Sequence, residues 1–209
     1  MRFIGITGGV GAGKSAILSY LKEKPNTKVL LADEIAHDLM EPGTECYEKI
    51  IASFAGEDIF SDEVDKGGEK GRPFDRGKLA QVIFSNETKR ERMNAIVHPA
   101  VKEYVREVFH KEKSKGELAL LVLEAALLIE EQYDEICDEL WYIYTSEENR
   151  RVRLAESRGY SEEKINQIFK SQLSEREFKE GTKVTIDNNG DLSKTYKEIE
   201  EALRRDVNE

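Results

Sequence analysis

The chain has 209 residues, of which 39% are hydrophobic and 35% are charged, and its formal net charge is −10. The length fits one α/β domain with insertions or a core with small appendages, and the composition is that of a well-solvated globular protein. The negative net charge argues against a general nucleic-acid binder, which would carry a basic surface. The longest apolar run, 118–129, is too short to span a bilayer and is interrupted by Glu124, so no membrane partner is expected either.

A glycine-rich stretch stands between a strand and a helix at the start of the chain. The β-prone run 2–7 precedes the segment GGVGAGKS at 8–15, and a helix with one apolar face follows to about residue 24. The segment fits the pattern G-x-x-x-x-G-K-[ST], whose backbone N–H groups cradle phosphate at a helix N-terminus. Lys14 can reach the β- and γ-phosphates, and the Ser15 hydroxyl can bind Mg²⁺. The alternative is a glycine-rich turn with a surface lysine, which the flanking elements disfavour.

A second strand is expected at 28–32, ending in Asp33. Ligands of open parallel sheets bind at the carboxyl ends of the strands, so this carboxylate is predicted to face the same crevice as the phosphate loop. It can accept a proton from a hydroxyl or hold a water bound to Mg²⁺. The alternative is that Asp33 caps the helix predicted to follow, and the two roles are compatible.

The segment between the second and third strands is predicted to be mainly helical. Helices are expected at 34–40, 47–54, 75–84 and 87–113. The last of them is predicted to break at His98-Pro99, because the residue before a proline disfavours the helical region. The polar, glycine-rich stretch 56–73 is predicted to be an exposed loop. The helical region, about 34–115, is where we expect a phosphate acceptor to be recognised.

A third strand is expected at 118–123 and a fourth at 139–144, with a helix beginning at Ser146. Glu124 directly follows the third strand. Phosphate-loop enzymes often hold an acidic residue near Mg²⁺ at such a position. The alternative is a turn or capping acid.

Four arginines follow the fourth strand: Arg150, Arg151, Arg153 and Arg158. Arginines at this place can clamp a phosphoryl group during transfer. The alternative is a solvated helix face paired with neighbouring glutamates, and it is stronger for the first two arginines than for the last two. The region of about 149–181 is predicted to form a lid, because kinases must exclude water from the transferred group.

A last strand at 183–187 and a helix at 192–205 complete the chain. Strands joined through helical crossovers must be parallel. The predicted fold class is therefore α/β, a five-stranded parallel-sheet P-loop kinase core with a helical acceptor-binding insertion and a lid. The core is expected to comprise about 1–33, 116–148 and 182–209.

The two cysteines, Cys46 and Cys137, lack the spacing of metal ligands. We expect free thiols in a reducing compartment. Arg2 is followed directly by the first strand, so no signal peptide is expected, and the prediction is a cytoplasmic protein.

Further motifs lie along the chain in order. Besides the phosphate loop they are ADEIA at 32–36, EPG at 41–43, the segment 76–84, His98-Pro99, LLIE at 127–130, Arg153-Leu154, Gln172 and IDNNG at 186–190. From Ile4 to about Leu203 the chain resembles the dephospho-coenzyme A kinase family. The resemblance implies a fold of the nucleoside-monophosphate-kinase type and transfer of the γ-phosphate of ATP to the ribose 3′-hydroxyl of dephospho-CoA. The implied partners are these two small molecules, with Mg²⁺ as cofactor.

The resemblance also suggests roles for individual residues. Asp33 matches the aspartate that activates the acceptor hydroxyl, and His98 lies toward the acceptor or forms a structural pair with Pro99. The expected site residues are Asp33, Lys14 and Arg153 for catalysis; Gly11, Ala12, Gly13, Lys14, Ser15, Ala16 and Asn188 for nucleotide binding; Asp33, His98 and Arg76 for the acceptor; and Ser15 and Glu124 for the metal.

The chain departs from the usual pattern of this family at several positions. They are Ala16 for threonine, His37 for arginine, Glu124 for aspartate, Ala126 for proline, Ser157 for a lid arginine and Gly181-Thr182 for Ala-Asp. Lys14, Ser15 and Asp33 are intact, so phosphoryl transfer is still expected. Two alternatives remain open: a kinase of another nucleoside or nucleotide acceptor, and a nucleotide-binding regulator that does not catalyse.

Overall fold

The structure, a computed structural model, describes residues 1–61 and 71–205. It divides into two compact units, one of Met1–Leu31 with Phe109–Glu209 and one of Ala32–Val108. Residues 62–70 of the loop predicted at 56–73 lie outside the described residues; on either side of them Phe60 and Phe74 form an antiparallel bridge.

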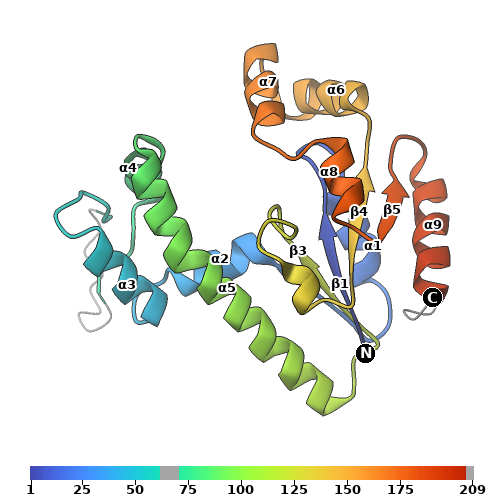
Figure 1. Cartoon of the computed structure of the whole chain (residues 1–209), viewed down its shortest axis with the longest axis horizontal. Coiled ribbons are helices and arrows are strands. Elements are labelled where there is room, and N and C mark those ends of the chain that lie inside the picture. The colour runs from blue at the N-terminus through green and yellow to red at the C-terminus, as the bar shows by residue number, and fades with distance from the viewer. Residues whose placement is uncertain (62–70, 206–209) are drawn as a thin grey trace. The chain divides into compact units, whose positions relative to one another are not determined.

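The first unit is built on a five-stranded parallel sheet in the order β2-β3-β1-β4-β5 (Figure 1). The strands are β1 (Arg2–Thr7), β2 (Thr27–Leu31), β3 (Leu120–Glu124), β4 (Glu139–Tyr144) and β5 (Val184–Asp187). All five were predicted, with bounds that differ by two residues or fewer. Strand β1 is central, so the segment that follows it emerges between the carboxyl ends of β3 and β4. The predicted fold class is confirmed.

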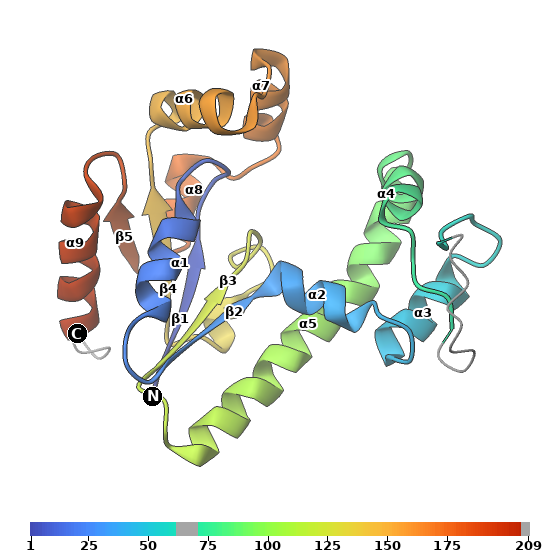
Figure 2. The ribbon, with the colours of Figure 1, turned by 180° about the vertical axis from the view of Figure 1, so that it is seen from behind.

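One face of the sheet is covered by two helices. Ile4 and Ile6 of β1 belong to a buried cluster that includes Ile17 of α1 (Lys14–Lys22) and Ile199 of α9 (Leu192–Arg204). Side chains alternate along a strand, so these even-numbered positions point to the same face. Seen from behind, α1 lies in front of the strands, with α9 beside it (Figure 2).

The other face carries the alternate side chains. Phe3 stacks on Phe109 of α5 (Glu87–Lys115), with 5.3 Å between ring centroids. Tyr142 stacks on Phe178 of α8 (Glu175–Glu180) at 4.7 Å. Burial raises the pKa of the Tyr142 phenol to about 12. The sheet is thus buried on both sides, as parallel sheets are.

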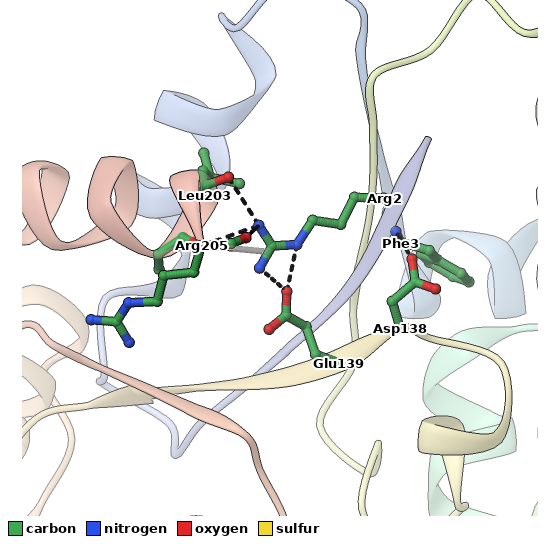
Figure 3. Close-up of polar contacts among 7 residues, drawn as sticks. Arg2, Phe3, Asp138, Glu139, Leu203 and Arg205 are labelled. Carbon is green, nitrogen blue, oxygen red and sulfur yellow. Dashed lines mark hydrogen bonds and ion pairs between the residues drawn. The ribbon is translucent and has the colours of Figure 1, made fainter. Parts of the chain in front are cut away.

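Arg2 joins three elements at the amino end of the strands (Figure 3). Its Nε donates to Glu139 Oε1 at 2.6 Å, and one terminal nitrogen donates to the carbonyls of Ala202, Leu203 and Arg205 at 3.1, 3.0 and 3.4 Å. Glu139 is 5% exposed. The cation also complements the C-terminal end of α9. This contact fixes the edge of the sheet opposite to the one from which the phosphate loop emerges.

The second unit is helical. Its helices are α2 (Ala32–Leu39), α3 (Glu45–Ser53), α4 (Arg76–Phe84) and most of α5. The predicted break at His98-Pro99 is wrong, because α5 runs continuously through Pro99. A proline removes one helical hydrogen bond, but here a continuous apolar face opposes the break. That face consists of buried side chains four residues apart: Met93, Val97, Val101 and Val105.

The region predicted to be a lid begins with a capped helix. Ser146 accepts from the Asn149 N–H at 3.3 Å, and α6 (Glu147–Arg158) ends at Gly159, with φ of 61°. Helices α7 (Glu162–Lys170) and α8 follow.

Both cysteines are free, as predicted, and both are buried. Across the described residues we find no helix with the length and apolar character of a membrane span.

Candidate active site

The phosphate loop links β1 to α1 and is shaped by glycines. Gly11 and Gly13 have φ of 85° and 84°, a region that other residues rarely adopt, and Gly13 is the N-cap of α1. The Ala12 N–H donates to the Gly9 carbonyl at 3.1 Å. The loop therefore turns tightly into a helix N-terminus, an arrangement that binds anions.

Lys14 lies between a loop carbonyl and a carboxylate. Its Nζ donates to the Gly8 oxygen at 2.7 Å and is 3.5 Å from Glu124 Oε1. Glu124 is the last residue of β3 and lies opposite Ile6 in the register with β1. The contact brings this acid beside the phosphate-loop lysine, and its assignment to Mg²⁺ stays a prediction. Ser15, in the first turn of α1, is exposed.

The Ala12 carbonyl accepts hydrogen bonds from three side chains. They are the Thr145 hydroxyl at 3.0 Å, the Asn188 amide at 2.7 Å and the Arg153 guanidinium at 3.3 Å. Asn188 is 2% exposed, and a Cβ on Gly13 would lie 2.5 Å from its Nδ2. The segments that follow β4 and β5 thus hold the phosphate loop in shape.

These loop-holding residues are themselves connected. Arg153 donates to the Asn188 carbonyl at 2.7 Å, and Asn189 accepts from the Ser146 N–H at 2.7 Å and from the Asn149 amide at 3.0 Å. Sequence reasoning selected Arg153 and Asn188 but missed Thr145 and Asn189. The available signal was their position directly after β4 and β5, at the edge where ligands bind.

The arginine cluster divides into different environments. Arg151 pairs with the exposed acids Glu147 and Glu162, as the solvated-face alternative expects. Arg158 is exposed at the end of α6, with its guanidinium 5.9 Å from the Tyr160 ring. Arg150, in contrast, donates from Nε to the Val10 carbonyl of the phosphate loop at 2.9 Å. The solvated-face alternative therefore fails for Arg150.

Three predicted residues belong to the second unit. Asp33 is exposed in the first turn of α2, and β2 ends at Leu31, so Ala32, predicted as the last residue of the strand, instead begins the helix. An alanine followed by two acids favours a helix start over a strand end. Arg76, the first residue of α4, contacts His37, and His98 lies half-buried in α5.

The residues expected to hold Mg²⁺ have suitable chemistry. A hydroxyl from Ser15 and a carboxylate from Glu124 are hard oxygen ligands, and Mg²⁺ takes few protein ligands beside substrate phosphates and water. The described residues contain no group of three or more His, Cys, Asp or Glu that could enclose a metal.

A phosphate-cradling loop between β1 and α1, on a five-stranded parallel sheet, defines the chain as a P-loop kinase. The model of the family described as dephospho-CoA kinase matches residues 2–194. The chain belongs to the dephospho-CoA kinase family.

Individual relatives agree with this assignment. The dephospho-CoA kinase of Shouchella clausii is 33% identical over 206 residues, 99% of each chain. Among solved structures, TT1252 from Thermus thermophilus is similar with a TM-score of 0.73 and 26% identity, over 97% of this chain and 96% of that one. A dephospho-CoA kinase from Campylobacter jejuni has a TM-score of 0.69 over 98% and 96% of the two chains; at 20% identity it supports the fold.

Proposed function

We propose that this chain transfers the γ-phosphoryl group of ATP to the ribose 3′-hydroxyl of dephospho-CoA, giving CoA and ADP. The observation that carries the proposal is the phosphate loop with Lys14 beside Glu124, in a chain that a dephospho-CoA kinase family model matches over residues 2–194. The reaction needs little covalent chemistry from the protein, so positioning and charge supply most of the catalysis.

Backbone N–H groups from Gly11 to Ala16 bind the phosphates of ATP. Lys14 moves to the γ-phosphate and stabilises the charge that develops there. Asn188 and Arg153 contribute through the Ala12 carbonyl, to which both donate, and so keep the loop in its binding shape. In this proposal they are positioning residues for the nucleotide.

Asp33 is the proposed base for the acceptor hydroxyl. Its carboxylate is exposed and accessible to a ligand. An aspartate near the acceptor can orient the hydroxyl and accept its proton. Arg76 and His98 are proposed to bind the acceptor, in the region of about 34–115, and the region of about 149–181 is proposed to act as a lid.

Mg²⁺ is the proposed cofactor, with Ser15 and Glu124 as its protein ligands. When bound, it supplies positive charge to the β- and γ-phosphates. Ser15 and Glu124 fix where that charge is located.

The proposal is tested by measuring the release of ADP from ATP in the presence of Mg²⁺ and each of a panel of acceptors. ADP release that depends on dephospho-CoA is expected. Faster release with adenosine or AMP would identify a kinase of another acceptor. ATP binding without release for any acceptor would favour a regulator that does not catalyse.

A further inference from the structure

Val10 of the phosphate loop is held by two side chains from outside the loop. The Val10 N–H donates to Gln172 Oε1 at 3.3 Å, and its carbonyl accepts from Arg150 Nε at 2.9 Å. A terminal nitrogen of Arg150 donates to the same Gln172 oxygen at 2.6 Å. Three hydrogen bonds therefore close a ring that uses both backbone polar groups of one loop residue.

The guanidinium of Arg150 is confined on two sides. It lies over the Phe169 ring, 4.3 Å from the centroid. It also covers Gly9, because a Cβ built there would lie 2.3 to 2.6 Å from three guanidinium atoms. Burial lowers the pKa of Arg150 from its ordinary value, although an arginine in a protein keeps its charge at neutral pH. A partly desolvated cation is thus fixed against the loop.

The neighbouring Arg151 shows that this placement is specific. Its guanidinium lies over the same Phe169 ring at 4.9 Å, but it bonds to the Glu147 and Glu162 carboxylates, both at 3.0 Å. Adjacent residues of one helix, with the same chemistry, therefore make a surface ion pair in one case and a loop contact in the other.

We propose that Arg150, together with Gln172, is a positioning residue that gives the phosphate loop its nucleotide-binding shape before ATP arrives. The N–H groups of such a loop must converge on the phosphates, and a loop that must be ordered on binding loses affinity. Arg150 donates two hydrogen bonds to the protein, one to the Val10 carbonyl and one to Gln172. It therefore affects ATP binding through the conformation of Val10. The inference rests on the proposed function only in taking ATP as the ligand of the loop, and it does not depend on the acceptor.

Binding of ATP in the absence of any acceptor, measured by titration calorimetry, tests the inference. Arg150→Ala should raise the Kd for ATP about tenfold or more, the effect of losing a charged hydrogen bond. The matched control Arg151→Ala should stay within about twofold of the unmodified protein. Turnover at saturating ATP should fall less than about threefold, because a positioning role acts on affinity.

Substitutions at two further positions separate the role of Arg150 from a general loss of structure. Gln172→Glu keeps an acceptor for both donors, and the Arg150 guanidinium beside it neutralises the added charge, so ATP affinity should be retained, whereas Gln172→Ala should lose part of it. Gly9→Ala, whose methyl group would displace the guanidinium, should weaken ATP binding in the unmodified protein. In an Arg150→Ala background it should add less than about a twofold change.

Three results would overturn the inference. One is unchanged ATP affinity in Arg150→Ala. Another is an equal effect of Gly9→Ala in both backgrounds. The third is a large fall in turnover at unchanged affinity, which would make Arg150 a direct contact of the transferred group. If Arg150→Ala does not fold, the Gln172 pair of variants gives the same decision, since equal affinities in Gln172→Ala and Gln172→Glu would also overturn it.

Discussion

The contact between Lys14 and Glu124 predicts two opposite effects of Glu124→Gln: tighter binding of ATP without Mg²⁺, and a higher Mg²⁺ requirement for turnover. The two charges are 3.5 Å apart, and their side chains are 16% and 19% exposed. At an effective dielectric constant of about 20 their attraction is about 5 kcal/mol. ATP must compete with this attraction for the ammonium group, and its phosphates are also repelled by the carboxylate.

Glu124→Gln removes the competing charge but keeps the shape. Water and the Gly8 carbonyl, which accepts from Lys14 at 2.7 Å, offset much of the lost attraction. We expect a net gain of about 1 to 2 kcal/mol, so that ATP without Mg²⁺ binds roughly 5 to 30 times more tightly. With Mg²⁺ the sign reverses, because the variant lacks the carboxylate proposed to hold the metal, and half-maximal turnover should need more Mg²⁺.

Calorimetric titration with ATP in EDTA measures the first effect, and turnover against Mg²⁺ concentration measures the second. The matched control is Glu117→Gln, an exposed acid that precedes β3 at the opposite end of the strand. If ATP binds Glu124→Gln no more tightly in EDTA, the pair does not restrain Lys14. An unchanged Mg²⁺ requirement would remove Glu124 from the proposed metal site.

Four further predictions concern other parts of the protein. Lys14→Ala should raise the activation free energy by about 3 kcal/mol or more and so lower turnover over a hundredfold in an ADP-release assay. Near-normal turnover would refute the loop assignment. Asp33→Asn should lower turnover on the order of a hundredfold with little change in ATP Kd, whereas a collapse of ATP binding would make Asp33 a metal-site residue. Arg153→Ala should reduce turnover at ATP concentrations below saturation more than Arg158→Ala, because of these two arginines only Arg153 donates to the Ala12 carbonyl, and equal losses would contradict this. Arg2→Ala should lower the free energy of unfolding by about 3 to 5 kcal/mol in urea, since it leaves a buried glutamate without its cation; a change below about 1 kcal/mol would show that the contact contributes little.

The strands and the phosphate loop could be predicted because their signals are local. A β-prone run, a glycine pattern and an amphipathic helix follow one another within the first 22 residues. The helix through Pro99 could not be predicted in the same way. Its continuity depends on a buried apolar face, and tertiary packing overrides the local preference of the residue before a proline.

The hydrogen bonds that hold the phosphate loop were harder to predict from the sequence. Thr145 and Asn188 meet at the Ala12 carbonyl because β1, β4 and β5 are neighbours in the sheet, and the hydrophobic pattern gives the strands but not their order. Arg150 and Arg151 are adjacent and chemically identical. Only the tertiary contacts of the folded chain distinguish them.

The central claim is the transfer of a phosphoryl group to one hydroxyl of dephospho-CoA, and identification of the product tests it most directly. The protein is incubated with ATP, Mg²⁺ and dephospho-CoA, and the products are analysed by mass spectrometry and phosphorus NMR. The account predicts equal amounts of ADP and of CoA that carries the new phosphate on the ribose 3′-oxygen. ADP formed without phosphorylated acceptor, or a phosphate on any other oxygen, would contradict it.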